Sequence, residues 1–233
     1  MQKIGIICAA DRELNPFLPH ITDCKTSEKA MLTFYEGTIG GVNIVAVYCG
    51  VCKTNAALAT QILIDTYNAD AVINAGTAGG MDSKLNLLDT VICTEAAYHD
   101  VHEDVLTQFH PWMPSVFFKS DAALLELSKT VADKFTIHYG RMVTGEAFIT
   151  DDGRDYINST FAPLSVDMET ASIAHVCYVN KIPFIAVRTI TDTADHSGKD
   201  NFEVNCDAAA NISKDIVLAM LHSFYHHSTP LNK

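Results

Sequence analysis

SVDMETASIAHVCYV, residues 165–179, predicts the end of a buried strand that runs directly into a helix. From residue 168 to residue 177, Glu169 is the one carboxylate among mostly apolar neighbours such as Met168 and Ile173. An ionised carboxylate in such surroundings loses much of its hydration energy unless a cation or hydrogen-bond donors compensate it. Glu169 therefore needs a partner, either as a structural ion pair with a distant arginine or as part of a functional site.

Two further carboxylates follow apolar runs elsewhere in the chain. Glu13 comes after IGIICAA, residues 4–10, and Asp192 comes after IPFIAVRTIT, residues 182–191. Both are expected at the C-terminal ends of buried strands, where open α/β sheets bind their ligands. We therefore expect these two side chains to converge with Glu169.

The three carboxylates suggest a hydrolytic reaction. Cleavage of a glycosidic bond needs one group that protonates the leaving group and one that activates water, and Glu13 and Asp192 could divide these roles. Arg188 lies four residues before Asp192 in the same predicted strand, so strand alternation places both on one face. There Arg188 could polarise the site or form an ordinary ion pair.

Length and composition favour one globular domain spanning residues 1–233. Hydrophobic residues make up 48% of the chain and charged residues 19%, enough for a continuous core. The net charge of −12, without a basic cluster, argues against nucleic acid and anionic membranes as partners. No signal-type segment or apolar run of about 20 residues is present, so we expect a cytoplasmic protein.

Strands and helices are expected to alternate, which predicts a three-layer α/β/α sandwich. The glycine-rich segment 74–80, NAGTAGG, is interpreted as a turn without the spacing of a dinucleotide fingerprint or a P-loop. Residues 101–118 are expected to form an ordered loop, and residues 150–161 a short polar helix. Strands are expected at 3–10, 69–76, 90–100, 136–149 and 180–198, the last with an exposed polar tail. Residues 31–50 are expected to form a hairpin that turns at Gly40 and Gly41. Helices are expected at 53–69, 121–134 and 203–227.

The cysteines and histidines leave other functions open. Cys49 and Cys52 form a C-x-x-C between a predicted strand and helix, a spacing that thiol oxidoreductases also use. The total of seven cysteines is odd and mostly within apolar runs, as in reduced core thiols. The histidines at 99, 102, 110, 226 and 227 show no helical i, i+4 pair, so we expect no metal. His175, in the apolar helix, is interpreted as a core histidine.

Several segments together resemble one enzyme family, the bacterial 5′-methylthioadenosine/S-adenosylhomocysteine nucleosidases of the nucleoside phosphorylase/hydrolase superfamily. The resemblance covers roughly residues 3–220 and is most specific around Met168 and Glu169 and from Arg188 to Asp192. It implies a mixed central sheet, a homodimer, no cofactor, and hydrolysis of methylthioadenosine, S-adenosylhomocysteine or 5′-deoxyadenosine to release adenine in methionine salvage. The segments, in order, are KIGIICAADREL, CGVCKTNAALATQ, INAGTAGG, EAAYHD, VTGEAFI, SVDMETASIAHVC and IAVRTITDTAD.

The resemblance also implies roles for individual residues. Asp192 would protonate adenine at N7, and Glu13 would activate water with Arg188 and Thr77 beside it. Glu169 would bind the ribose hydroxyls. The remaining contacts would be Met168 beneath the sugar, Phe148 stacked on adenine, the Ile149 backbone at the edge of adenine, Val51 and Phe202 around the 5′ substituent, Thr191 in the pocket wall, and Phe109 or Trp112 reaching the partner's 5′ pocket.

The chain departs from the family pattern at four residues and in one segment. Ala10 replaces a methionine that lines the 5′ pocket, Cys52 replaces a glycine, and Thr77 and Thr191 replace serines. The segment 101–118 also differs, so the sequence does not determine the preferred 5′ substituent. Three rival functions remain at this point: a purine nucleoside phosphorylase of the same superfamily, a C-x-x-C thiol oxidoreductase, and a nucleoside-binding protein without catalysis.

Overall fold

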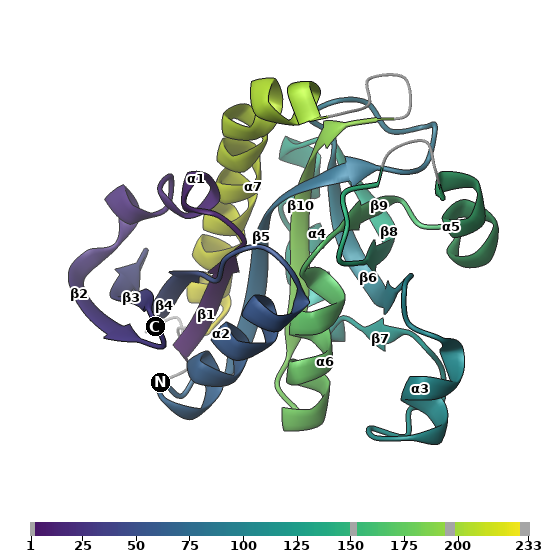
Figure 1. Ribbon diagram of the computed structural model, residues 1–233. Coiled ribbons are helices and arrows are strands. Elements are labelled where there is room, and N and C mark those ends of the chain that lie inside the picture. Colours follow the sequence, from purple (N-terminus) through teal and green to yellow (C-terminus); the bar gives the residue numbers. More distant parts are fainter. Residues whose placement is uncertain (1–2, 150–152, 194–198, 229–233) are drawn as a thin grey trace.

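The computed structural model describes residues 3–149, 153–193 and 199–228. Its described strands form one mixed sheet of ten strands, in the order β10-β6-β8-β9-β5-β1-β4-β3-β2, with β7 beside β6 (Figure 1). The strands are β1 (Lys3–Cys8), β2 (Thr22–Lys29), β3 (Leu32–Ile39), β4 (Val42–Tyr48), β5 (Ala71–Gly80), β6 (Thr90–Tyr98), β7 (Phe118–Lys119), β8 (Ile137–Thr144), β9 (Ser165–Asp167) and β10 (Phe184–Asp192).

Five of these strands pair in a closed ring. β5 pairs with β10, β10 with β6, β6 with β8, β8 with β9, and β9 returns to β5. The short strand β9 closes this ring and leads into α6 (Thr170–Asn180), as the sequence of residues 165–179 predicted. The ring therefore brings the C-terminal ends of β5, β9 and β10 together.

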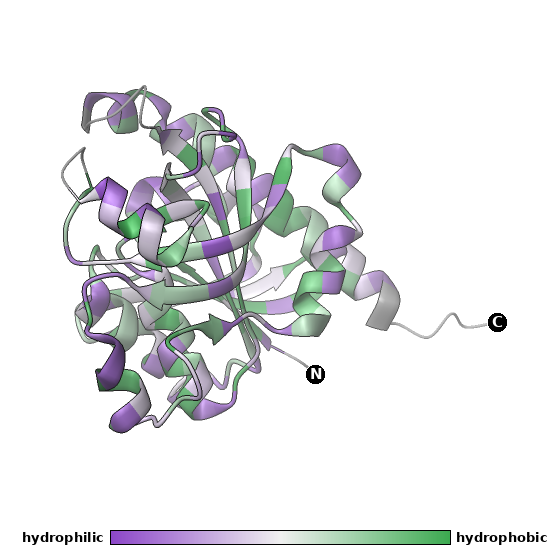
Figure 2. Ribbon diagram, turned by 90° about the vertical axis from the view of Figure 1, so that its right-hand side faces the viewer, coloured by the Kyte–Doolittle hydropathy of each residue, from purple (hydrophilic) through white to green (hydrophobic). Residues whose placement is uncertain are grey.

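Helices cover both faces of the sheet. On one face, α2 (Lys53–Asp65) packs against α6, and on the other face α7 (Lys199–Ser228) packs along β5 and β10 with α4 (Ala122–Lys129) beside it (Figure 1). The central strands are mostly apolar, whereas the helices alternate hydrophilic and hydrophobic residues along their length (Figure 2). The predicted α/β/α sandwich is confirmed.

The sheet separates two main clusters of buried side chains. Leu63 of α2 and Ile173 of α6 belong to one cluster, and Val217 and Met220 of α7 belong to the other. Burial of a large aliphatic side chain stabilises the fold by about 1.5–3 kcal/mol. The shorter elements lie around this frame: α1 (Asp11–Leu14), the 3₁₀ turns Leu18–His20 and Ala132–Lys134, α3 (Glu103–Gln108) and α5 (Arg154–Phe161).

Most predicted elements are present, and the hairpin is the clearest case. Gly40 and Gly41 have φ angles of +56° and +85°, as a two-residue hairpin turn with positive φ requires. The polar tail expected after β10 and the start of the polar helix fall partly on residues 194–198 and 150–152, outside the described residues.

None of the described helices is both long and apolar enough to cross a membrane.

Four predictions about the elements were wrong. The supposed turn 74–80 is the second half of β5, because β10 and β9 supply hydrogen-bond partners along it. The strand expected at 136–149 ends at Thr144, so Phe148 lies in a loop. The segment 101–118 contains the helix α3 and the first residue of β7. The terminal helix begins at Lys199 rather than at residue 203.

Candidate active site

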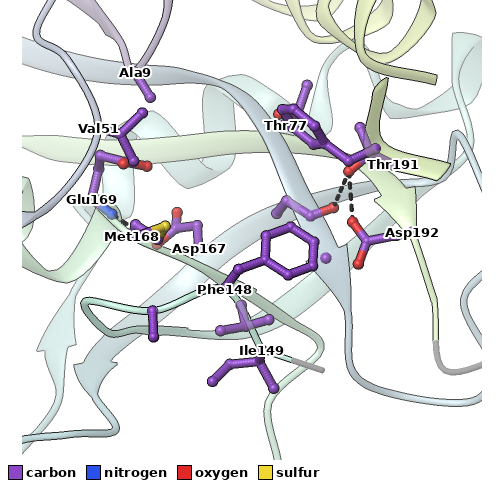
Figure 3. A pocket seen from close by; sticks show the side chains of 15 residues that line it. Ala9, Val51, Thr77, Phe148, Ile149, Asp167, Met168, Glu169, Thr191 and Asp192 are labelled. Carbon is purple, nitrogen blue, oxygen red and sulfur yellow. Dashed lines mark hydrogen bonds between the residues drawn. The ribbon is translucent and has the colours of Figure 1, made fainter. Parts of the chain in front are cut away.

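A pocket opens at the C-terminal ends of β5, β9 and β10. It takes residues from these strands, from the loop before α5, from the segments after β1 and β4, and from α7 (Figure 3). Nine of the predicted site residues line it: Val51, Thr77, Phe148, Ile149, Met168, Glu169, Thr191, Asp192 and Phe202. The remaining lining residues are Ala9, Ala78, Gly79, Ala147, Val166 and Asp167.

Arg188 lies beneath this pocket and is only 1% exposed. Its guanidinium is 3.1 Å from Glu169, 3.2 Å from Asp167 and 3.6 Å from Glu13. It also donates a hydrogen bond to the carbonyl of Thr77, at 3.1 Å. Burial opposes the charge of Arg188, but the three carboxylates outweigh it and raise its pKa further. One cation therefore organises three carboxylates.

Glu169 has the partners that the sequence predicted it needs. One carboxylate oxygen accepts a bond from Arg188 and the other accepts the backbone N–H of Cys52, at 3.0 Å. Burial is the largest influence on its pKa and raises it to about 7, although Arg188 acts in the opposite direction. Glu169 therefore forms the predicted ion pair with a distant arginine, and it also lines the pocket.

Glu13 is held from several directions just behind the pocket wall. One oxygen accepts the backbone N–H and the hydroxyl of Thr77, at 2.7 and 2.8 Å, and the other accepts the N–H groups of Ala9 and Ala10. Gly76 has a φ of +156°, and a Cβ there would lie 2.4 Å from the Glu13 carboxylate. A glycine is therefore required where β5 passes this side chain.

Asp192 ends β10 and faces the pocket. The hydroxyl of Thr191 donates to it at 2.8 Å, as Figure 3 shows. Burial raises the pKa of Asp192, while Thr191 and the positive charge of Arg154 act in the opposite direction. A bulge between Ile190 and Asp192 interrupts the strand register. The alternation argument that placed Arg188 and Asp192 on one face assumed a regular strand, so it does not apply across this bulge.

The apolar side chains gather on the opposite wall. Phe148 and Phe202 meet edge to face, with ring centroids 6.5 Å apart. Ile149 and Met168 lie on either side of Phe148 in Figure 3, and Val51 is 48% exposed at the rim. These side chains give the pocket an apolar surface that includes two aromatic rings.

The matched family model is described as the phosphorylase superfamily and spans residues 3–222. A 5′-methylthioadenosine/S-adenosylhomocysteine nucleosidase of Staphylococcus carnosus is 36% identical over 228 residues, covering 94% of this chain and 99% of the relative. The chain belongs to this nucleosidase family. The resemblance stated from the sequence is confirmed.

Solved structures of this nucleosidase family and its superfamily share the fold. The nucleosidase of Colwellia psychrerythraea, in complex with adenine, has a TM-score of 0.86 and 33% identity and covers 95% of both chains. The native futalosine hydrolase of Helicobacter pylori also has a TM-score of 0.86, with 27% identity, covering 94% of this chain and 97% of that one. Enzymes with different names therefore share this backbone fold, so their side chains must determine which substrate each of them binds.

Four predicted residues do not line the pocket: Glu13 and Arg188 lie just behind it, and the other two lie elsewhere on the single chain. Phe109 and Trp112, on the segment after α3, are 65% and 67% exposed and do not line it. Arg12, the residue before Glu13, is also absent from the lining and bonds to Glu203 and Asp207 at the surface.

Sequence reasoning missed two charged residues in or near this pocket. Asp167 binds Arg188 and accepts hydrogen bonds from the hydroxyls of Thr144 and Thr170. Its position two residues before Glu169 was the available signal. The second is Arg154, 7% exposed, which no sequence pattern indicated.

The cysteines and histidines bear on the thiol oxidoreductase and metal-site alternatives. Burial raises the pKa of Cys49 and, with Glu146, that of Cys52, so neither thiol favours the thiolate that redox chemistry needs. The histidine inventory was incomplete, because His222 and His226 form an i, i+4 pair on α7, with Nε2 atoms 3.1 Å apart. The described residues contain no group of three or more His, Cys, Asp or Glu arranged to hold a metal ion.

Proposed function

We propose that this protein hydrolyses the N-glycosidic bond of 5′-methylthioadenosine and S-adenosylhomocysteine, with water as nucleophile, and releases adenine. 5′-Deoxyadenosine would undergo the same reaction. Family membership supports this proposal, and one observation carries it. Glu13 and Asp192 lie against the same strand, at Thr77 and Gly79 of β5, in different surroundings.

Asp192 suits the acid step. An adenine anion is a poor leaving group, so a proton must reach the base as the bond breaks. Burial raises the pKa of Asp192, which favours the protonated form that an acid must have before it reacts. Phe148 and Ile149 line the same part of the pocket and would hold the base by stacking and by its edge (Figure 3).

Glu13 suits the water step. Four donors face its carboxylate, as an ionised acceptor requires, and Thr77 and Arg188 would border the water it activates. Thr77 and Gly79 are two residues apart, about 7 Å along a strand. Inverting glycosidases keep their two carboxyl groups about 6.5–9.5 Å apart to leave room for water.

Glu169 and Met168 would hold the ribose between these two groups. The Glu169 carboxylate is fixed by Arg188 and by the N–H of Cys52, so its orientation is set before substrate binds. Val51 and Phe202 border the pocket where a 5′-thio substituent would extend. Thr191 would act by orienting Asp192.

A phosphorylase is less compatible with this site. Phosphate would need arginine or N–H donors beside the sugar, whereas Arg12 is bound at the surface and Arg188 is occupied by carboxylates. A carboxylate about 4 Å from bound phosphate opposes it by about 4 kcal/mol per unit charge at an effective dielectric near 20.

Incubation with methylthioadenosine in phosphate-free buffer tests the proposal. We expect adenine and free methylthioribose in equal amounts by chromatography, at a rate that added phosphate does not raise. Adenine release only in the presence of phosphate would indicate a phosphorylase. Absence of any turnover would leave a nucleoside-binding protein.

We also propose that the protein forms a homodimer through the segment around α3. Val105, Phe109 and Trp112 expose apolar surface there, as interfaces often do before assembly. Phe109 or Trp112 would then reach the partner's 5′ pocket. Sedimentation should show a dimer, and replacing both aromatics by Ala should raise KM for methylthioadenosine more than for adenosine. An active monomer would contradict this arrangement.

A further inference from the structure

Arg154, at the start of α5, is an unusual buried cation. Its side chain is 7% exposed, and Nη1 donates to the backbone carbonyl of Gly80 at 2.7 Å. Nε and Nη2 have no hydrogen-bond partner, and no carboxylate forms an ion pair with Arg154, within the described ranges. Burial of an arginine with two unused donor atoms is costly, so its retention needs an explanation.

The carbonyl that Arg154 binds belongs to the strand against which Asp192 lies. In the register of β5 and β10, Gly79 is the partner of Asp192. A Cβ on Gly79 would be 3.1 Å from the Asp192 carboxylate, and one on Gly80 would be 3.3 Å from the Asp192 carbonyl. Arg154 therefore fixes the backbone that supports Asp192.

Arg154 also connects this strand to the loop that carries the aromatic wall. Phe148 and Ile149 come a few residues before α5, and the helix begins with Arg154. At its other end, α5 packs Ile157 and Phe161 against Met81, just after β5. The guanidinium bond therefore attaches the start of α5 to β5, and Asn158 of α5 also donates to the carbonyl of Met81.

We propose that Arg154 is a positioning residue for the acid step, which holds the end of β5 beneath Asp192 and aligns it with the loop of Phe148 and Ile149. This inference rests on the proposed function, because it assumes that Asp192 donates the proton. When that proton leaves, the carboxylate formed is stabilised by the nearby guanidinium charge.

The electrostatic surroundings of Asp192 support this role. Gly79 of β5, Val166 of β9 and Phe202 of α7 contribute uncharged surface to the pocket, and the carboxylate of Asp167 at the end of β9 is paired with Arg188. Thr191, on its own strand, donates a hydrogen bond. Among the described groups, Arg154 on α5 is the charge that counteracts the effect of burial on the pKa of Asp192.

Two substitutions separate the effect of the Arg154 charge from the effect of its hydrogen bond to the Gly80 carbonyl. Arg154→Gln keeps an N–H donor for the Gly80 carbonyl but removes the charge, and Arg154→Lys keeps the charge. Arg141→Gln is the matched control, because Arg141 donates to the carbonyl of Phe161 at the other end of α5.

The expected readout is the pH dependence of kcat. An acid works only while protonated, so activity falls as the pH rises through the pKa of Asp192 in the complex. Loss of the positive charge raises that pKa, so Arg154→Gln should move the high-pH limb upward by about one unit and lower the plateau kcat about 10-fold, with little change in KM. Arg154→Lys and Arg141→Gln should keep the limb of the wild type.

Titration of the Asp192 carboxyl by ¹³C NMR tests the same inference without turnover. We expect a higher pKa in Arg154→Gln than in the wild type and in Arg141→Gln. An unchanged pKa with an unchanged kcat in folded Arg154→Gln would overturn the inference and leave Arg154 a structural residue. If the wild type released no adenine, the proposed function would fail, whereas the NMR titration would still measure the coupling between Arg154 and Asp192.

Discussion

Glu13 and Asp192 contact the same strand but have opposite surroundings. Glu13 is surrounded by four hydrogen-bond donors from Thr77, Ala9 and Ala10. Asp192 accepts one hydroxyl bond, from Thr191, and burial raises its pKa. The Glu13 carboxylate is thus held by four donors, whereas burial favours the protonated form of Asp192. The contrast teaches that surroundings, rather than residue type, assign the base and the acid.

Neutralising either carboxylate should have the largest effect. We expect Glu13→Gln and Asp192→Asn each to lower kcat by at least about 100-fold, because each removes one proton-transfer group. Both amides keep the size of the side chain, so circular dichroism should show an intact fold. A folded variant with nearly normal kcat would remove its residue from the assigned role.

The sequence predicted that Glu13 and Asp192 belong to one site, because both follow long apolar strands. Glu169 was found for a related reason, since a carboxylate among apolar residues needs a partner. Asp167 was missed although it is close by, because its partner Arg188 is 21 residues away and only the fold joins them.

Other errors have the same origin in tertiary pairing. The glycines of residues 74–80 resemble a turn, but β10 and β9 pair with this segment and keep it extended. β2 has eight exposed residues and no apolar alternation, so it gave no strand signal, and it exists because β3 pairs with it. The bulge before Asp192 likewise depends on the neighbouring strand. Local patterns cannot encode such pairings.

The third carboxylate, Glu169, should show a smaller effect. Glu169→Gln removes a charged acceptor for the ribose hydroxyls, and hydrogen bonds to charged groups contribute about 1.5–3 kcal/mol, so kcat/KM should fall about 10- to 100-fold. The loss should be smaller for a 2′-deoxy substrate. If the wild type cleaves that substrate as well as the ribose form, Glu169 does not bind the 2′-hydroxyl.

Cys52 contributes its backbone rather than its thiol to the site. Its φ of +86° is strained for a residue with a side chain, while its N–H holds Glu169. Cys52→Gly should therefore stabilise the fold by about 1 kcal/mol, raise Tm by about 2–4 °C and retain activity. Cys24→Gly, the same exchange on the extended strand β2, is the control and should lower Tm. Loss of turnover in Cys52→Gly would favour a redox role.

A further expected effect is on the pH dependence of stability. Burial raises the pKa of Glu169 to about 7, above the ordinary value of 4.5, so the folded state binds more protons than the unfolded state between these values. The free energy of unfolding should therefore fall as pH rises from about 4.5 to about 7. Urea titrations should show a weaker fall in Glu169→Gln. Equal slopes in both proteins would contradict the assigned pKa.

The division of roles between Glu13 and Asp192 is tested most directly with a substrate whose leaving group needs no proton, such as the 4-nitrophenyl analogue of methylthioribose. Nitrophenolate departs without an acid, whereas water must still be activated. We predict that Asp192→Asn hydrolyses this substrate at close to the wild-type rate and that Glu13→Gln remains at least about 100-fold slower. Equal losses in both variants, or rescue of Glu13→Gln alone, would contradict the assignment of acid and base.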